Sequence, residues 1–283
     1  MPSPRARVYL AGPMFSIGDT HEQTELRRAL SKKYDVHMPQ KDGIEVASVM
    51  SLLSNPDLHG ASMLESPVID RMVVWVTRII EALDIYQSVE GCQCVVLNLD
   101  GRVPDEGALV EATLAFYAGL PVVPFKTTPI TELGFNDNPM VNAVCGWVPP
   151  KDTPADVLKA VDAAMSNPPT IDLECVPPHI QLFCQLGRAI WQIRKRRTWK
   201  PADVLRANTE LQALPVAARN LIEAEKLLQP IALRVAVTII EFSRLEKGGP
   251  KQLAIIRQLI SDSKKWSKQR GVRKAIIDNQ VTA

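Results

Sequence analysis

Short apolar, β-branched runs alternate with segments of helical periodicity through the first 165 residues, and this alternation constrains the fold most. The expected strands are residues 7–12, 36–39, 94–99, 120–125 and 145–148, and the expected helices are residues 20–33, 66–90, 107–118 and 153–165. Strands joined by helices need right-handed crossovers. The pattern therefore predicts an α/β fold with a flavodoxin-like or Rossmann-like, doubly wound parallel sheet of five strands.

The strand pattern ends at a proline-rich stretch, residues 167–178. Beyond it the sequence predicts helices only, at residues 180–197, 201–211, 216–228, 231–245 and 251–266. We therefore expect two domains, an α/β domain over residues 1–170 and an all-α domain over residues 171–283.

The two halves of the chain differ in charge. Residues 1–175 hold 13 Lys and Arg against 23 Asp and Glu, whereas residues 176–283 hold 20 against 8. An acidic half suits a site built on carboxylates. A basic half suits nucleic acid, an anionic substrate or the acidic half itself.

Composition also excludes several classes of protein. The sequence lacks the run of roughly 18 apolar residues that a membrane span needs, and its N-terminus has no signal-peptide pattern, so we expect no membrane contact and a cytoplasmic location. The five cysteines are scattered through apolar stretches, which indicates buried free thiols. The four histidines lack metal spacing and no nucleotide-binding glycine loop occurs, so no metal and no cofactor are expected.

Ligands of doubly wound sheets bind beyond the carboxyl ends of the strands. After the third expected strand the sequence reads PDEGALVEATLAFYAG, residues 104–119, in which Asp105 is a natural N-cap and Glu111 lies near the second turn. Two converging carboxylates suit the cleavage of a glycosidic bond, since one can trap the sugar while another group protonates the leaving base. The alternative is that Asp105 and Glu111 only cap and solvate an amphipathic helix.

Three tracts resemble the nucleoside 2-deoxyribosyltransferase family. They are VYLAGPMF at residues 8–15, the tract from Trp75 and Asp84 to the strand CVVLNLD, and an Asp, a Gly and a Glu at positions 105, 107 and 111. The resemblance covers roughly residues 6–150. It implies that Glu111 is the nucleophile, Asp105 binds sugar hydroxyls, Asp84 contacts or protonates the base, and Tyr9 orients Glu111.

The resemblance implies further substrate-binding residues. Gly12 and the backbone beside it would line the pocket. Apart from the resemblance, Gly107 lets another group approach the backbone closely, and Phe15 is a candidate to stack on a base, although aromatic residues more often serve as core. After the second strand, Gln40 and Asp42 are candidates to bind the base, although ordinary loop polarity also explains them. The spacing from Asp84 to Asp105 is about one residue longer than in the family, so Asp84 could instead be a surface acid.

Asn138 and Asn142 lie in a segment that resembles the family region reaching into a neighbouring subunit's site. This implies a homo-oligomer in which an Asn binds the sugar or its 5′ substituent. An Asn-Pro pair also makes an ordinary turn, and that alternative stays open.

The basic second half has no counterpart in this resemblance. Its clusters of cations beside Trp199 and Trp266 suit nucleic acid, and they equally suit solvated helix ends. It could be an interaction module, a lid or an oligomerisation element.

These features lead us to expect an enzyme that cleaves the N-glycosidic bond of a nucleoside or nucleotide and transfers 2-deoxyribose to another nucleobase. The alternatives are an N-glycosidase that transfers the sugar to water, and a nucleotide-sensing or nucleic-acid-binding module without turnover.

Overall fold

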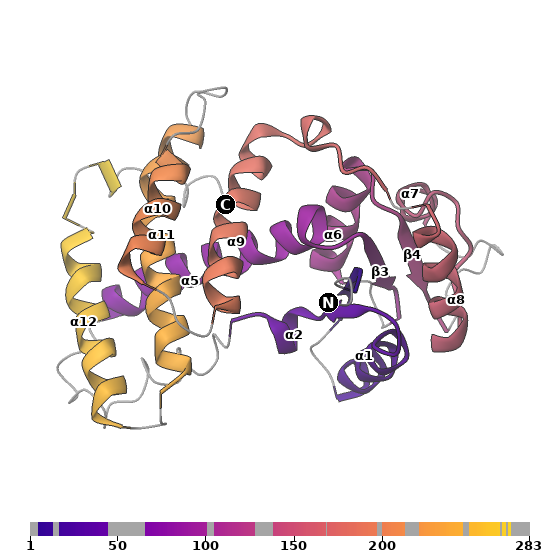
Figure 1. Cartoon of the computed structure of the whole chain (residues 1–283), viewed down its shortest axis with the longest axis horizontal. Helices are drawn as coiled ribbons and strands as arrows, with labels where there is room; N and C mark the ends of the chain where they lie inside the picture. The colour runs from indigo at the N-terminus through magenta and orange to yellow at the C-terminus, as the bar shows by residue number, and fades with distance from the viewer. Residues whose placement is uncertain are drawn as a thin grey trace. The chain divides into compact units, whose positions relative to one another are not determined.

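The computed structural model of the 283-residue chain describes residues 5–13, 17–44, 66–100, 105–127, 138–167, 169–196, 200–212, 221–245 and 249–272, the last without 267 and 270. The chain divides into two units (Figure 1). The first unit comprises residues 1–43 and 84–177, and the second comprises residues 44–83 and 178–283.

A parallel sheet forms the centre of the first unit. Its strands are β1 (Arg7–Ala11), β2 (Asp35–His37), β3 (Cys94–Asn98) and β4 (Val122–Phe125), in the order β2-β1-β3-β4. Val8 is in register with Val36 on one side and with Cys94 on the other. The expected α/β class and parallel sheet are therefore confirmed, and the strand order reverses between β1 and β3, where such sheets bind ligands.

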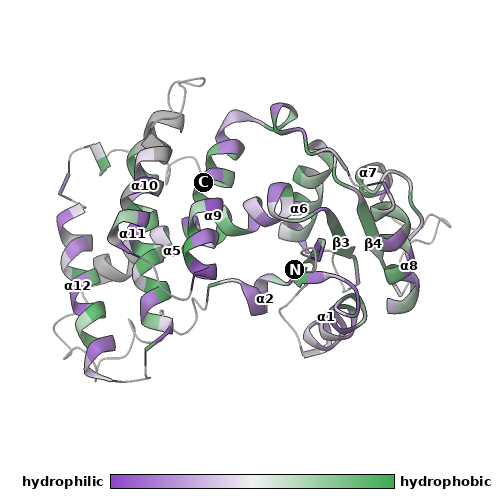
Figure 2. Ribbon diagram, viewed as in Figure 1, coloured by the Kyte–Doolittle hydropathy of each residue, from purple (hydrophilic) through white to green (hydrophobic). Residues whose placement is uncertain are grey.

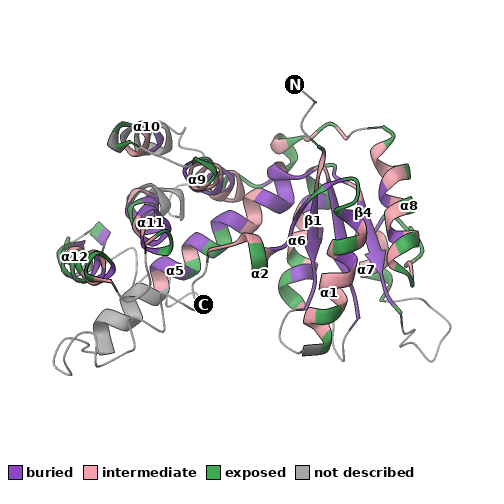
Figure 3. Ribbon diagram, turned by 60° about the horizontal axis from the view of Figure 1, so that its bottom comes forward, coloured by how far each residue is buried: buried purple, intermediate pink, exposed green. Residues whose placement is uncertain are grey.

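Helices cover both faces of this sheet. Val8 and Leu10 point to the face covered by α1 (Ile17–Leu30) and α8 (Pro154–Met165), whereas Tyr9 and Ala11 point to the face covered by α6 (Glu106–Tyr117). Figure 3 shows the strands β1 and β4 as largely buried, and Figure 2 shows β3 and β4 as apolar. The near-continuous apolar runs of the sequence arise from this burial on two sides.

The ends of α6 and α8 follow the residues that the sequence supplies there. The Asp105 side chain accepts a hydrogen bond from the Ala108 amide at 2.7 Å and so caps α6. The Thr153 side chain caps α8 in the same way by accepting a hydrogen bond from the Asp156 amide. Gly119 follows α6 with φ +81°, a conformation that favours glycine. The start of α6 is therefore fixed beside the carboxyl end of β3.

The expected fifth strand at residues 145–148 is wrong. Cys145 ends helix α7 (Pro139–Val144), a turn follows, and the chain then makes only a parallel bridge between Phe125 and Lys151. Pro124 in β4 has no amide hydrogen to donate to a further strand. The described sheet accordingly has four strands and β4 lies at its edge.

In the second unit every regular element that the structure describes is a helix. They are α9 (Pro178–Lys195), α10 (Pro201–Gln212), α11 (Leu221–Ser243), α12 (Pro250–Trp266) and most of α5 (Ser66–Tyr86). The boundary after Pro177 falls in the expected linker, but residues 44–83 also belong here rather than to a continuous domain 1–170. The reason is packing, because Trp75, Val76 and Ile79 are buried in one apolar core with α9, α11 and α12.

Helix α11 replaces two expected helices. We expected a break at Pro230, but the helix continues through it. Leu228, Ile231 and Ala232 around the proline are buried, and this burial outweighs the loss of one backbone hydrogen bond.

Four of the five cysteines, Cys92, Cys94, Cys145 and Cys184, are buried free thiols as expected, whereas Cys175 is exposed. None of the helices that the structure describes is both long and apolar enough to cross a bilayer.

Two neighbouring isoleucines test whether α5 belongs to the helical core. Ile79 is fully buried in that core, whereas Ile80 is 38% exposed. We expect Ile79→Ala to lower the free energy of unfolding by about 2–5 kcal/mol and Ile80→Ala to lower it by less than about 1 kcal/mol. Urea unfolding followed by circular dichroism measures both, and equal effects would contradict the assignment of α5.

Candidate functional site

Tyr9 and Glu111 meet at the face of the sheet that α6 covers. Tyr9 lies in the middle of β1, fully buried, and its hydroxyl donates a hydrogen bond of 2.8 Å to Oε1 of Glu111. Glu111 lies on the second turn of α6, between the buried Ala108 and Ala112 that face the sheet. The structure thus brings together two residues that are 102 positions apart in the sequence.

Asp84, in the last turn of α5, adds a second carboxyl group to this pair. Burial raises the pKa of Asp84, and burial followed by the negative charge of Asp84 raises the pKa of Glu111. Burial and the charges of Asp84 and Glu111 also raise the pKa of Tyr9, so the phenol keeps its proton. As whole residues, Asp84 and Glu111 are neither fully buried nor exposed.

Asp84 and Glu111 titrate as a pair, since each charge disfavours the other. The hydrogen bond from Tyr9 lowers the pKa of Glu111 and so favours the charge there, whereas no described residue donates such a bond to Asp84. Burial and the charge of Asp84 outweigh this hydrogen bond, so the pKa of Glu111 is raised to about 8 and that of Asp84 to about 7. The arrangement offers two interacting carboxyl groups that share a proton, one on α6 and one on α5.

Asp105 and Gly107 begin α6 as the sequence predicted. The charge of Asp105 contributes to the raised pKa of Glu111, but one Asp105 oxygen is already engaged in capping the helix. A Cβ atom on Gly107 would lie 3.2 Å from that oxygen. The glycine is therefore explained by the cap, without a ligand.

Gly12 follows β1 with φ +155°, and no side chain fits there. A Cβ atom would lie 2.1 Å from the Gln23 amide nitrogen and 2.7 Å from Cβ of Asn98. The close approach is thus made by protein side chains from α1 and β3. Phe15 lies outside the described residues.

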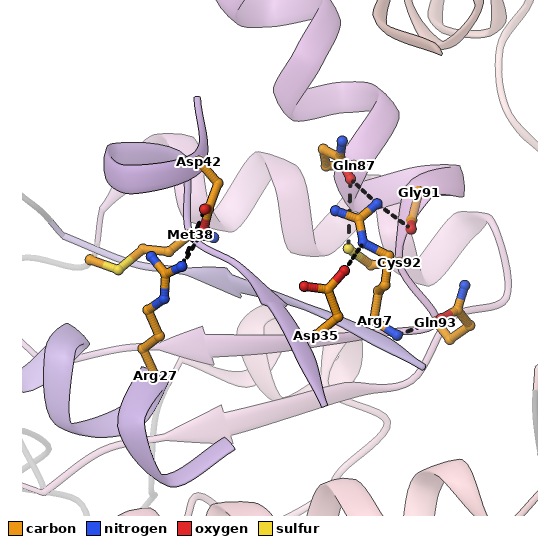
Figure 4. Close-up of polar contacts among 9 residues, drawn as sticks. All are labelled: Arg7, Arg27, Asp35, Met38, Asp42, Gln87, Gly91, Cys92 and Gln93. Atoms are coloured by element: carbon orange, nitrogen blue, oxygen red, sulfur yellow. Dashed lines mark hydrogen bonds and ion pairs between the residues drawn. The ribbon is translucent and has the colours of Figure 1, made fainter. Parts of the chain in front are cut away.

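Gln40 and Asp42 lie in the short helix α2 (Pro39–Asp42) after β2. Gln40 is exposed. Asp42 accepts a hydrogen bond from the Met38 amide at 2.9 Å and pairs with Arg27 at 3.1 Å, as Figure 4 shows. The Asp42 carboxylate therefore has a structural role, and no described contact joins either residue to Glu111.

Asn138 and Asn142 belong to α7. Asn138 is exposed and caps the helix by accepting a hydrogen bond from the Met140 amide at 2.9 Å. The backbone oxygen of Asn142 accepts a hydrogen bond from the Trp147 amide. The described hydrogen bond of the Glu111 side chain is to Tyr9, not to Asn138 or Asn142.

Sequence reasoning missed a polar cluster at the carboxyl ends of β1 and β3. The Asn98 amide donates to Glu22 at 2.8 Å, and both oxygens of Asp100 accept the Thr127 amide. Gln23 is 1% exposed, and its amide has no hydrogen-bond partner in the described structure. The available signal in the sequence was that Gln23 lies in the helix that follows Gly12, because the Gln23 side chain of α1 lies against that glycine.

The described residues contain no group of His, Cys, Asp and Glu side chains that could hold a metal ion. Several basic residues of the second unit make contacts within that unit. Arg194 and Lys195 lie 5.5 and 5.0 Å from the Trp191 ring, and Arg196 pairs with Asp203.

Comparison with known proteins leaves the family open. No protein-family model and no curated protein matches the chain. Among solved structures, the chain is similar to a conserved protein from Enterococcus faecalis V583, with 19% sequence identity, a TM-score of 0.36 and coverage of 56% of this chain and 98% of the other.

Removing Tyr9's hydroxyl and removing Asp84's charge should move the titration of Glu111 in opposite directions. We expect Tyr9→Phe to raise the pKa of Glu111, since the ionised form loses a donor, and Asp84→Asn to lower it, since a repelling charge disappears. Carbon-13 NMR of labelled carboxyl groups measures both shifts. Shifts of the same sign would contradict the proposed arrangement.

Proposed function

We propose that the first unit cleaves the N-glycosidic bond of a deoxynucleoside or nucleotide and passes the 2-deoxyribosyl group to another nucleobase. The observation that carries this proposal is the hydrogen bond from the buried Tyr9 to Glu111 beside the second acid, Asp84. The likeness of the three sequence tracts to nucleoside 2-deoxyribosyltransferases supports the same chemistry.

The first step breaks the bond between the sugar and the base. One oxygen of Glu111 accepts a hydrogen bond from the Tyr9 hydroxyl. The other oxygen is left to attack C1′ of the sugar. The electron pair of the C1′–N bond goes to the departing base, and Asp84 supplies its proton. A glycosyl ester of Glu111 results, with Asp84 ionised.

The second step reverses the first with a different nucleophile. A ring nitrogen of an acceptor base attacks C1′, Asp84 takes the proton of that nitrogen, and the Glu111 ester bond breaks. If water attacks instead, the same site is an N-glycosidase. Tyr9 holds Glu111 in one orientation during both steps.

A matched pair of acids on α6 tests the proposal. We expect Glu111→Gln to lower the rate of base release by at least ~10³-fold, because the nucleophile is lost. Glu106→Gln, in the exposed first turn of the same helix, should retain the rate. The assay is chromatography of a panel of nucleosides and nucleotides with and without an acceptor base.

The products separate the alternatives. Base exchange identifies a transferase, and free base without exchange identifies an N-glycosidase. If the wild-type protein releases no base from any member of the panel, the proposal fails and a nucleotide-binding module without turnover replaces it.

We also propose that the first unit assembles as a homo-oligomer through α6 and α7. Val110 and Tyr117, seven residues apart on one side of α6, are 59% and 58% exposed, and Met140 and Trp147 in and after α7 are 73% and 70% exposed. Helix α7 packs against α6. Apolar side chains gathered on neighbouring elements favour association, and Asn138 at the start of α7 would then face a second copy.

Charged substitutions test this surface. We expect Val110→Lys with Tyr117→Lys to convert an oligomer into monomers, because two charges would be buried. Leu227→Lys is the matched control, since Leu227 is 49% exposed on the second unit. Sedimentation velocity measures the assembly state, and a monomeric wild-type protein would refute the proposal.

A further inference from the structure

A π-helical turn, η1 (Gln87–Gly91), directly follows α5 and leads into β3. Such turns bond less favourably than an α-helix and are rare, and they often occur at functional sites. Gln87, Ser88, Val89 and Gly91 are buried. Asp84 lies three residues before this turn, in the last turn of α5.

Arg7, the first residue of β1, binds both ends of η1 (Figure 4). Its Nη1 donates to Oε1 of Gln87 at 2.9 Å and to the Gly91 carbonyl at 3.1 Å. Its Nε pairs with Asp35 of β2 at 3.0 Å, so the guanidinium is fixed from the opposite side. A single side chain thus joins two strands to the turn.

The contacts of Arg7 with Gln87 and Gly91 form a clamp, and the residues around it leave little free space. A Cβ atom on Gly91 would lie 2.5 Å from Oε1 of Gln87, so a larger residue would displace the acceptor. The Gln87 amide nitrogen is buried without a hydrogen-bond partner in the described structure. Burying an unpaired amide is unfavourable, and the contact of its oxygen with Arg7 offsets that burial.

Arg7 and Gln87 each lie two or three residues along a regular element from a residue of the acidic site. Tyr9 is two residues after Arg7 on the same face of β1, and Asp84 is one helical turn before Gln87. We propose that Arg7 is a positioning residue, which holds Asp84 beside Tyr9 and Glu111 by clamping η1 to β1. Its consequence for catalysis rests on the function proposed above.

The charged and titratable groups that face this site are Tyr9 on β1, His37 on β2, Asp84 on α5, Cys92 after η1, and Asp105 and Glu111 at the start of α6; the His37 ring stacks on that of Tyr9. If the clamp is released, Asp84 moves away from Glu111 and the repulsion between them decreases. The pKa of Glu111 then falls. Simple loss of the positive charge of Arg7 would have the opposite effect, because a cation stabilises carboxylates.

The experiment is carbon-13 NMR titration of the full chain with labelled Asp and Glu carboxyl groups, assigned through Asp84→Asn and Glu111→Gln. Arg7→Lys keeps the charge but cannot bind both acceptors, and Gln87→Met keeps the size but removes one acceptor. We expect both variants to move the titration of Glu111 downward by about one pH unit. Arg27→Gln, which breaks the ion pair with Asp42, should leave it unchanged.

The outcomes separate this inference from the proposed function. If the pKa of Glu111 is unchanged or raised in Arg7→Lys and Gln87→Met, the inference is overturned. The contacts of Arg7 would then only stabilise the fold, as the ion pair of Arg27 does. Because the titration needs no substrate, absence of turnover would refute the proposed function and leave this test intact.

Discussion

The close approach of α6 to the sheet is the constraint on which the candidate site depends. Ala108, Ala112 and Ala115 present only methyl groups to the strands, so the helix axis lies near β1 and β3. At that distance the Tyr9 phenol spans the gap and reaches Glu111. Larger side chains at these three positions would separate the helix from the sheet and break the hydrogen bond that orients the carboxylate.

Placing two acids beside a buried phenol destabilises the fold in a pH-dependent way. The pKa values of Asp84 and Glu111 are raised, so the folded chain binds these protons more tightly than the unfolded chain does. The stability they contribute is complete below the ordinary carboxyl range and is lost as the pH rises through their raised values. Such strain is expected where carboxyl groups are held for chemistry.

Sequence patterns predicted the parts of the fold that local chemistry determines. Four β-branched runs form strands, Asp105 caps α6 and Gly119 ends it. Periodicity did not reveal that α5 packs in the helical core, because an apolar stripe does not identify its partner. In the site, Tyr9 and Glu111 form a hydrogen bond between residues far apart in the sequence, and the ion pair of Asp42 with Arg27 depends on tertiary packing that no motif encodes.

Helix α5 links the acidic site to the basic half of the chain through one continuous backbone. The first unit holds 11 Lys and Arg against 18 Asp and Glu, and the second unit holds 22 against 13. Trp75, Val76 and Ile79 stabilise α5 through the core of the second unit, while Asp84 lies at its other end. In proteins most of the stability of a helix comes from tertiary packing. The core of the second unit therefore stabilises the part of α5 that belongs to that unit.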